Sequence, residues 1–433
     1  MSALNLVYIH SHDTGRYIQP YGAPVETPRL QAFAEQGVLF RQAYCAAPTC
    51  SPSRASLLTG MYAHETGMLG LAHRGFELHY PQRHLAHVLR EYGYRTALFG
   101  MQHLADESQL AKLGYQSAWT ERSEAEIIAP MAAAWLLESP AEPFFLDVGF
   151  FETHRPFPDV YTAHDAVYTA PMPGLPDTPE TRLDAAGFHH SVHTLDQGIG
   201  QVLDALDQGG LTGRTLVICT TDHGPAFPGM KCTLSNLGTG VMLIMRGPGE
   251  CSGGQIIDGL VSHLDVFPTI CELLNIYAPE WLQGHSLMPL VRREHEHIRQ
   301  MVFSEVTFHA AYEPQRGLRT TRWSYIRRYD GREHRVLPNI DDSPSKDVLL
   351  RHGLQSQLIA PEELYDLVFD PYERQNLATN PVYADTLNEM RALLDEWMQA
   401  TNDPLLPWGL IVPDHVLVND PDGFSPNEPT RPA

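Results

Sequence analysis

The sequence predicts an α/β fold in which helices flank a large, mixed but mostly parallel sheet, followed by a smaller C-terminal α+β domain with an antiparallel sheet. Before residue 310, apolar runs of strand length alternate with helical patterns, which is typical of a doubly wound sheet. Most of these runs end in polar residues, as expected where parallel strands deliver side chains to one sheet edge. After residue 310 the apolar and polar residues alternate, as in antiparallel strands. We therefore expect a large domain over residues 1–310 and a small domain over residues 311–433.

The strands and helices of the large domain are predicted in regular alternation. A buried strand over residues 4–9 comes first, and a helix over residues 29–36 follows it. Thr27-Pro28 suits the start of that helix and Gly37 its end. Further strands are expected over residues 38–44, 96–99, 144–150, 216–220, 241–245 and 256–259, and further helices over residues 85–92, 185–207 and 268–274.

The small domain has a different pattern. Residues 317–328 alternate like one exposed antiparallel strand, residues 363–367 form a second short strand, and residues 383–400 form an amphipathic helix. After Thr401, many proline and aspartate residues predict an extended arm. Specificity is expected to come from loops at the sheet edge, over residues 74–84, 157–179 and 306–315, and from the small domain.

The composition excludes several classes of partner. The chain has 52 acidic and 30 basic residues and a formal charge of −22, which argues against a broad surface for nucleic acid or anionic membrane. No apolar run reaches the roughly 18 residues that a membrane span needs. The N-terminus lacks a basic region, a long apolar core and a small-residue cleavage site, so we expect a cytoplasmic protein. The sequence leaves the oligomeric state open, and a homo-oligomer is compatible with it.

Residues 50–60, Cys-Ser-Pro-Ser-Arg-Ala-Ser-Leu-Leu-Thr-Gly, form the most reactive stretch of the chain. A thiol, a proline, two hydroxyls and a cation precede an apolar run that is typical of a starting helix. Because a helix N-terminus and Arg54 both favour negative charge, an anionic group could be held over the Cys50 side chain. The other five cysteines are scattered without CxxC spacing, which indicates buried thiols rather than disulfides or a zinc cage.

Two predicted strand ends carry an aspartate beside a histidine. His12-Asp13 follows the first strand, and Asp222-His223 follows the strand over residues 216–220. Carboxylates with imidazoles suit a divalent metal, and the mixture favours Mn²⁺, Zn²⁺ or Fe²⁺ more than oxygen ligands alone would. Each pair taken alone is equally compatible with a turn. Both pairs together, near the Cys50 loop, favour metal binding.

Three more residues are candidates for acid, base or anion-binding roles. His103 and His154 follow strand ends, and Lys231 lies in the loop after Asp222. Histidine is the side chain best suited to proton transfer near neutral pH. The residues by themselves therefore predict a metal, an anion-binding loop and acid or base candidates, but no particular reaction.

Residues 50–60 match the CxPSRxxxxTG signature of type I sulfatases in the alkaline phosphatase superfamily, and the chain resembles that family along most of its length. The flanking segments that also fit are residues 27–28, 37–44, 64–68, 221–224, 265–269 and 363–377. Within the family, residues 67–71, His154-Arg155 and the spacing from Asp222 to Lys231 are most similar to the heparan N-sulfatase (sulfamidase) branch.

The resemblance implies an alkaline-phosphatase-like sandwich and a formylglycine- and metal-dependent sulfatase that hydrolyses a sulfate ester or sulfamate, with a sugar or other small molecule as leaving group. Cys50 would be oxidised to formylglycine by the formylglycine-generating enzyme. One oxygen of the aldehyde hydrate would attack sulfur, and the other would allow sulfate to be eliminated.

Site roles follow from the same resemblance. It implies one divalent metal, Ca²⁺ by family likeness, and the histidines make Mn²⁺ or Zn²⁺ plausible. The metal ligands would be His12, Asp13, Asp222 and His223. The remaining assignments are Arg54 to orient formylglycine, Lys231 to hold a sulfate oxygen, His103 as the base for elimination and His154 as the acid or a contact at the leaving group.

The sequence departs from the family pattern at two positions. Met101 stands where many sulfatases have a lysine, and His12 stands where the family has an aspartate. These departures keep open a phosphonate monoester or phosphodiester hydrolase with the same nucleophile, so the substrate is a small sulfated or phosphorylated molecule. A cysteine-dependent phosphatase is disfavoured, because Cys50 and Arg54 have three intervening residues where that loop has about five. A binding protein without activity is the last alternative.

Overall fold

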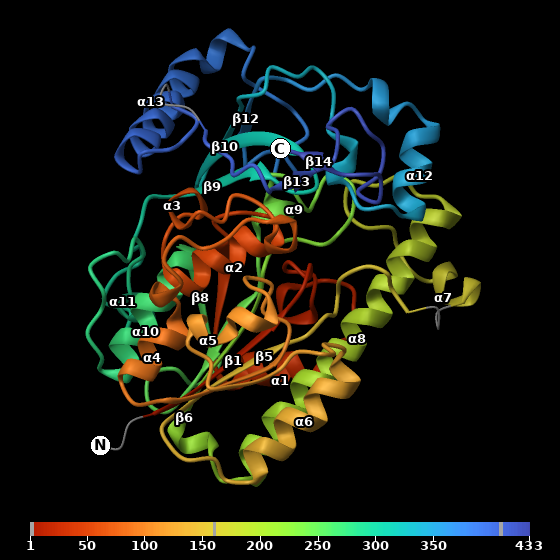
Figure 1. The fold of residues 1–433 in the computed structure, drawn as a ribbon. Helices are drawn as coiled ribbons and strands as arrows, with labels where there is room; N and C mark the ends of the chain where they lie inside the picture. The colour runs from red at the N-terminus through yellow and green to blue at the C-terminus, as the bar shows by residue number, and fades with distance from the viewer. Residues whose placement is uncertain (1–3, 159–161, 407–409) are drawn as a thin grey trace.

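The computed structural model describes residues 4–158, 162–406 and 410–433. The N-terminal Met1–Ala3, three residues of the segment 157–179 and three residues of the predicted arm therefore lie outside the described residues. The described chain forms an eight-stranded sheet and a four-stranded sheet, with a further two-stranded pair near the C-terminus. Figure 1 shows the four-stranded sheet above the edge of the larger one.

The eight-stranded sheet is mostly parallel, as predicted. Its strands lie in the order β4-β3-β5-β1-β6-β7-β2-β8, and β7 alone runs antiparallel to its neighbours β6 and β2. The strands are β1 (Asn5–Ser11), β2 (Val38–Tyr44), β3 (Arg95–Gly100), β4 (Ser117–Trp119), β5 (Phe144–Gly149), β6 (Thr215–Thr221), β7 (Leu243–Arg246) and β8 (Gln255–Ser262). The central strands β1 and β6 are buried along their whole length, which explains why they read as continuous apolar runs.

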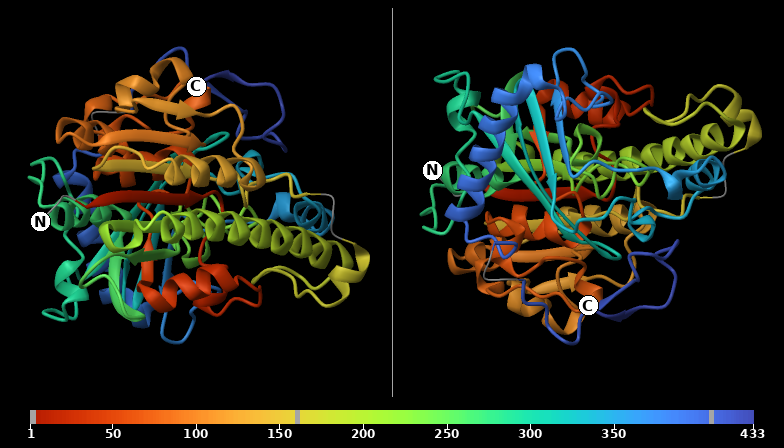
Figure 2. Two further views of the ribbon diagram at one scale, coloured as in Figure 1. Left: turned by 90° about the horizontal axis from the view of Figure 1, so that it is seen from below. Right: turned by 90° about the horizontal axis from the view of Figure 1, so that it is seen from above.

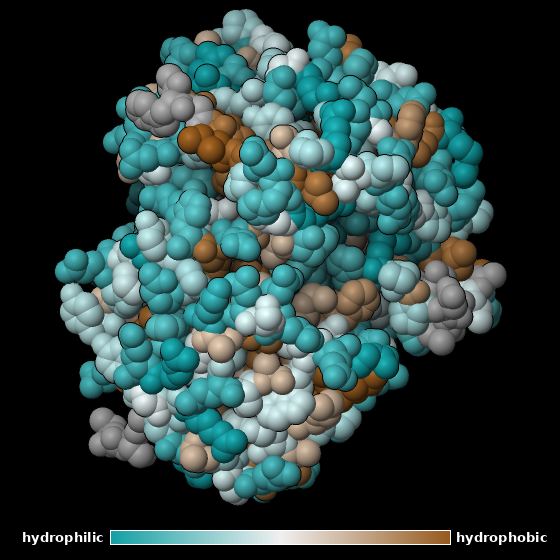
Figure 3. Space-filling view, viewed as in Figure 1, coloured by the Kyte–Doolittle hydropathy of each residue, from teal (hydrophilic) through white to brown (hydrophobic). Residues whose placement is uncertain are grey.

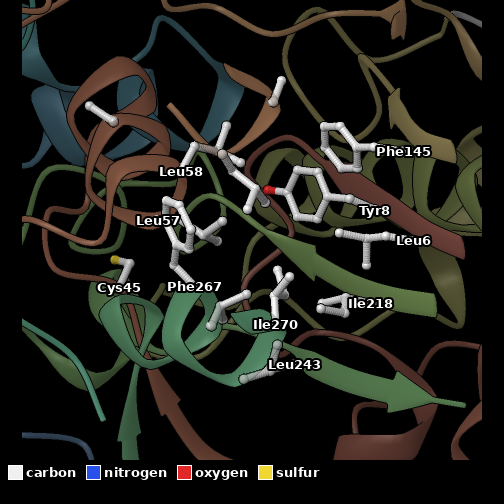
Figure 4. Packing of buried hydrophobic residues seen from close by; sticks show 14 of the residues in the cluster. Leu6, Tyr8, Cys45, Leu57, Leu58, Phe145, Ile218, Leu243, Phe267 and Ile270 are labelled. Atoms are coloured by element: carbon white, nitrogen blue, oxygen red, sulfur yellow. The ribbon is translucent and has the colours of Figure 1, made fainter. Parts of the chain in front are cut away.

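Helices cover both faces of this sheet, so the large domain has three layers (Figure 2). One face packs against α2 (Cys50–Thr59), α4 (Leu85–Glu91) and α10 (Val266–Leu274), and the other packs against α1 (Pro28–Gln36), α6 (Ala125–Leu137) and α8 (Pro179–Gln208). Alternate residues of β1 supply the two cores: Leu6 and Tyr8 on one side, Val7 and Ile9 on the other. Figure 4 shows Leu57 and Phe267 packed near Tyr8 in the first of these cores.

The four-stranded antiparallel sheet corrects one prediction. Residues 317–328 are not one exposed strand: they belong to β10 (Tyr312–Thr320) and β11 (Trp323–Arg328), which are largely buried. The other strands are β9 (Met301–Phe308) and β12 (Glu362–Asp366). Helix α13 (Ala384–Ala400) packs its apolar face on this sheet, with Leu394 and Trp397 in a core that includes Tyr325. Burial under α13 hides a face that alternation alone marks as solvated. The division at residue 310 stays a prediction, although β9 begins before it.

The described residues also form short helices and turns, mainly in the segments that connect the longer helices and strands. The α-helices are α3 (Ala63–Thr66), α5 (Leu110–Leu113), α7 (Ala163–Val167), α9 (Asn236–Thr239), α11 (Met288–Val291) and α12 (Pro344–Arg351). The 3₁₀ turns are η1 (Gln19–Tyr21), η2 (Ala72–Arg74), η3 (Pro81–Arg83), η4 (Glu107–Gln109), η5 (Thr212–Arg214), η6 (His263–Asp265), η7 (Leu337–Asn339), η8 (Leu354–Ser356) and η9 (Pro381–Tyr383).

The C-terminal segment, residues 410–433, lies along the protein instead of projecting from it. It contains the short strands β13 (Leu417–Val418) and β14 (Arg431–Pro432). Val416 is fully buried in the same core as α2, and the backbone N–H of Asn419 donates to the carbonyl of Ala310 at 2.8 Å. Both views in Figure 2 show this segment, in dark blue, beside orange segments from the N-terminal half of the chain.

The surface is largely polar and no described helix suits a membrane crossing, as the many charged residues of the sequence lead us to expect. Hydrophilic residues cover most of the face shown in Figure 3. Among the described residues, no helix combines the length and the apolar character that a membrane crossing would need.

A buried charged cluster joins α3 to the small sheet. The His64 Nδ1 atom lies 2.9 Å from Glu305 Oε1, and its Nε2 lies 3.2 Å from the Thr401 carbonyl. The Arg316 guanidinium lies 3.5 Å from Glu305 Oε2 and donates to Asp403. Burial lowers the pKa of His64, but the Glu305 carboxylate outweighs this effect and raises it. The protonated imidazole can donate to both oxygen partners.

We predict that His64 stabilises the fold more at low pH than at high pH. Because its folded pKa is raised, its contribution is fully present below its unfolded pKa of about 6.5 and is lost as the pH rises through the folded value. The difference in Tm between the wild type and His64→Gln should therefore be larger at pH 5.5 than at pH 8.5. A difference that is the same at both values would contradict the assignment.

Candidate active site

The predicted site residues meet at one edge of the large sheet. Strands β3, β5, β1 and β6 are parallel neighbours, so the residues that follow them emerge side by side. The side chains delivered in this way are His12 and Asp13 after β1, His103 after β3, His154 after β5, and Asp222 and His223 after β6. The structure therefore brings together residues that are up to 211 positions apart, from His12 to His223.

Cys50 is the first residue of α2 and faces this edge from the other side. It is 1% exposed. The helix is fixed on the site by hydrogen bonds of its own first turn: the Ser53 N–H donates to the Thr49 carbonyl at 2.9 Å, and the Ser53 hydroxyl donates to the Asp222 carbonyl at 2.5 Å. The motif serine thus joins the helix carrying Cys50 to the loop that carries two other site residues.

Five side chains could hold a metal ion. One ligand atom each from His12, Asp13, Cys50, Asp222 and His223 lies within 4.8 Å of all the others, and all five residues are buried. The backbone N–H of Asp13 donates to Asp222 Oδ1 at 2.9 Å, which aligns the two carboxylates. Asp13 itself has a φ of 55°, in the left-handed region that aspartate tolerates better than most residues.

The two histidines of this group are suited to act as neutral ligands. Burial lowers the pKa of His12 to about 4, although Asp222 and Asp13 oppose the shift, and its Nδ1 lies 3.0 and 3.1 Å from the two carboxylates. The His223 Nδ1 atom lies 2.9 Å from the Gly224 carbonyl. A proton on that nitrogen would leave Nε2 as the lone-pair atom, 3.3 Å from Asp13 Oδ1. Two carboxylates and two imidazoles fit a divalent cation.

Two buried cations balance the carboxylates. The Arg54 guanidinium donates to Asp222 Oδ2 at 3.0 Å and to the Ser11 carbonyl at 3.0 Å. The Lys231 ammonium donates to Asp13 Oδ2 at 3.0 Å and lies 3.2 Å from Asp341 Oδ2. Burial lowers the pKa of Lys231, but the Asp13 and Asp341 carboxylates outweigh it and hold the pKa well above the usual value. Lys231 is therefore charged at neutral pH and can bind an anion.

The Cys50 thiol is a poor nucleophile as it stands. Burial is the largest cause that holds its pKa well above the ordinary value, and the nearby carboxylates of Asp13 and Asp222 add to it, against Lys231 and Arg54. A thiolate would be needed for direct attack on an anionic substrate. This environment therefore disfavours the cysteine-dependent phosphatase that the sequence left as an alternative.

The candidate acid and base line the entrance to the same centre. His154 places Nε2 3.9 Å from Asp13 Oδ2. His103 stacks on His73 with ring centroids 5.4 Å apart, and its Nε2 lies 3.1 Å from His73 Nδ1. Burial is the main reason that the pKa of His103 is well below the ordinary value, with the nearby His12 and Arg54 acting in the same direction. His103 is therefore neutral at pH 7, as a base must be.

A cavity of about 560 Å³ opens onto Cys50, and the small domain supplies part of its wall. His309 follows β9 and is 6% exposed, with its Nδ1 buried and without a hydrogen-bond partner in the described residues. Asp341 follows η7 and contacts Lys231. His309 lies in a loop predicted to determine specificity, but no local signal singles out either His309 or Asp341, because each reaches the cavity through long-range packing. The cavity is also lined by His73, Arg74, Arg155, Asp184, Asp342, Pro426 and Asn427.

Behind Arg54 lies a buried chain of polar side chains that motif reading does not indicate. The Arg54 Nη1 atom contacts His10 Nδ1, and His10 Nε2 lies 3.0 Å from Asp147 Oδ1 in β5. The Tyr115 hydroxyl donates to the same carboxylate. Burial lowers the pKa of His10, with Arg54 contributing, so the neutral ring can accept from Arg54 and donate to Asp147. This series of hydrogen-bonded side chains orients Arg54, the arginine of the motif.

Fold and site together are those of a sulfuric ester hydrolase, and the comparisons with known proteins agree. The chain belongs to the sulfatase family, whose model matches residues 4–276. A second model, described as N-sulphoglucosamine sulphohydrolase, C-terminal, matches residues 233–348. The resemblance that the sequence motifs indicated is confirmed.

Similar proteins span nearly the whole chain. It is 30% identical to the human protein "N-sulphoglucosamine sulphohydrolase", with 91% of this chain and 88% of that protein covered. It is 27% identical to an "Ulvan-active sulfatase" of Formosa agariphila, with 92% and 75% covered. A solved structure described as a complex with its substrate D-glucosamine-2-N,6-O-disulfate has a TM-score of 0.74 at 19% identity, covers 94% of this chain and all (100%) of that one, and confirms the fold.

We predict that a divalent cation raises the Tm of the wild-type protein and has no such effect on Asp222→Asn. A ligand that binds only the folded state stabilises it by about 2.7 kcal/mol at a concentration a hundred times its Kd. Thermal melts after dialysis against a chelator, with Ca²⁺, Mn²⁺ or Zn²⁺ added singly, would also rank the metals. Asp258→Asn, which changes an exposed carboxylate, is the matched control. An equal shift in both variants would exclude Asp222 as a ligand.

Proposed function

We propose that the protein is a formylglycine- and metal-dependent sulfatase that hydrolyses a sulfate ester or sulfamate of a sugar. The observation that carries this proposal is the position of Cys50, the cysteine of the CxPSR motif, which lies buried among two carboxylates and two imidazoles. Burial and the two carboxylates disfavour a thiolate nucleophile at this position, whereas an oxygen nucleophile formed from this cysteine would use these surroundings.

The proposed reaction assigns one task to each residue. Lys231 and Arg54 hold the negative charge at the centre, and a hydroxyl of the residue-50 aldehyde hydrate loses its proton to solvent and attacks sulfur. His154 gives a proton to the oxygen or nitrogen of the leaving group as its bond to sulfur breaks. Neutral His103 then takes the proton of the second hydroxyl, the carbon–oxygen bond to sulfate breaks, and the aldehyde is restored.

The proposed metal ligands are His12, Asp13, Asp222 and His223. A divalent cation bound there would lower the pKa of the attacking hydroxyl and polarise the sulfate group. The residues themselves supply the rest: Arg54 holds Asp222, Lys231 holds Asp13, and the Gly224 carbonyl orients His223. Thermal melts with Ca²⁺, Mn²⁺ or Zn²⁺ added singly would identify the divalent ion that this proposed site prefers.

The substrate class follows from the relatives and from the cavity. The names of the similar proteins refer to sulphoglucosamine and ulvan, and the similar solved structure holds a glucosamine disulfate. The 560 Å³ cavity has the size of a small-molecule site, and charged and imidazole side chains dominate its lining. A polar, sugar-sized leaving group fits these features. Cytoplasmic location and maturation by the formylglycine-generating enzyme stay predictions from the sequence.

We predict that Cys50→Ala and Cys50→Ser lose sulfatase turnover by about a thousandfold or more, because they remove the nucleophile of a unit that acts together. The protein would be produced with the formylglycine-generating enzyme, and sulfate release from glucosamine N-sulfate would be measured. Intact-mass analysis should show aldehyde at residue 50 in the wild type only. Full activity in Cys50→Ala, or a thiol in an active wild type, would refute the proposal.

The alternative with a specific observation in its favour is a phosphonate monoester or phosphodiester hydrolase. Its support is the Asp222-His223 pair and the absence of a lysine at Met101. We predict that a sulfate ester is turned over with a higher kcat/KM than the corresponding phenylphosphonate or phosphodiester, measured in parallel with nitrophenyl leaving groups. A higher value for either phosphorus compound would replace the sulfatase assignment with the alternative.

A further inference from the structure

Arg74 lies on the wall of the cavity that contains Cys50, at the end of the short turn η2. Three neutral oxygens hold its guanidinium. Nη1 donates to the Ala310 carbonyl at 3.0 Å and to the Asn419 side-chain oxygen at 2.7 Å, and Nη2 donates to the Pro426 carbonyl at 3.3 Å. The guanidinium therefore has a fixed position but keeps its full positive charge.

Each of the other two cations of the cavity wall is already paired with a carboxylate. Lys231 lies between Asp13 and Asp341, and Arg155 makes two hydrogen bonds with Asp184, at 2.7 and 2.8 Å. Arg74 forms no ion pair with any carboxylate of the described residues. Its lowered pKa has burial as the sole cause, which agrees with the absence of a partner charge. The charge of Arg74 is therefore available to an anionic ligand in the cavity.

The carboxylates that share the cavity do not fill this role. Asp341 is paired with Lys231, and Asp342 accepts a hydrogen bond from Lys346 at 2.8 Å and from Asn427 at 3.1 Å. Of the five N–H groups of Arg74, three are used by the oxygens named above, so two remain. Two donors on one guanidinium match the paired oxygens of a carboxylate or a sulfate.

We propose that Arg74 binds a second anionic group of the substrate, a carboxylate or a second sulfate, while the Cys50 centre holds the sulfate that is cleaved. This inference rests on the proposed sulfatase function and narrows its substrates to those with two anionic groups. Arg74 is a specificity-determining residue and takes no part in proton transfer or nucleophilic attack.

The C-terminal segment holds Arg74 in this position. Asn419, which accepts from the guanidinium, is itself fixed: its backbone N–H donates to the Ala310 carbonyl at 2.8 Å, and its side-chain N–H donates to the Glu428 carbonyl at 2.7 Å. Pro426 and Asn427 from the same segment line the cavity. The segment therefore both closes one side of the cavity and orients the cation in its wall.

Two matched substrate pairs test the proposal. Glucosamine N-sulfate is compared with glucosamine N,6-disulfate, and a hexose 2-O-sulfate is compared with the hexuronate 2-O-sulfate that differs by one carboxylate. For the wild type we expect kcat/KM to be about tenfold higher for the member with the second anion in at least one pair, the size expected of a charge-assisted hydrogen bond. The pair that shows the preference tells whether the second anion is a sulfate or a carboxylate.

Three variants assign the preference to Arg74. Arg74→Gln should remove it, mainly through KM, and should leave turnover of the singly charged member within about twofold, whereas Arg74→Lys should retain part of it. Asn419→Asp leaves the arginine in place and puts a carboxylate against it, so it should also reduce the preference. Arg41→Gln, which removes an exposed charge paired with Asp258, controls for the change in net charge. Unchanged Tm values show that each variant is folded.

The outcomes separate the two claims. Absence of sulfate release from every compound by the aldehyde-bearing wild type would overturn the proposed function and, with it, this inference. Sulfate release with no preference in either pair would overturn the inference alone. A preference that survives both Arg74→Gln and Asn419→Asp would likewise overturn it.

Discussion

The structure depends on placing two carboxylates, Asp13 and Asp222, side by side in a buried position. Like charges without water repel strongly, and each also loses its hydration. Arg54 and Lys231 offset part of this cost: Asp13, Asp222 and Lys231 lie in loops that follow parallel strands, and Arg54 lies in the helix α2 that faces them. The His10, Asp147 and Tyr115 chain extends the support of Arg54 into the sheet. The precision of the centre is thus a property of the whole sheet edge.

Much of the large domain could be predicted because short stretches of its sequence are enough to indicate each strand or helix. Strand β2 has the predicted bounds, and β1, β3, β5 and β6 differ from the predicted bounds by at most two residues at either end. The carboxyl ends of parallel strands lie at the same edge of a sheet. The side chains that follow these ends, His12, Asp222, His103 and His154, can therefore be predicted to meet. Helix α6 and the short edge strand β4 gave no comparable signal. The alternation over residues 317–328 was misleading because helix α13 covers that sheet.

The rest of the cavity could not be predicted, because it depends on contacts between distant segments. Arg74 and His309 lie in segments predicted to determine specificity, yet neither their orientation nor their partners follow from spacing. Asp341 and Asn419 reach the cavity only through the packing of the small domain and the C-terminal segment. The departures at Met101 and His12 also need the structure. Neutral His12 lies between the two carboxylates, where an aspartate would add a third negative charge.

The contact between the C-terminal segment and Arg74 has a consequence for biosynthesis. Strand β7 joins β2, which precedes the helix carrying Cys50, to the rest of the sheet, and the last strand of that sheet, β8, ends at Ser262. The segment that closes the cavity, residues 419–427, begins 157 residues later. At the usual rate of about 5–20 residues per second, the sheet edge can be complete for about 8 seconds or more before this wall of the cavity is made. During that interval the centre is open to larger molecules than the finished protein admits.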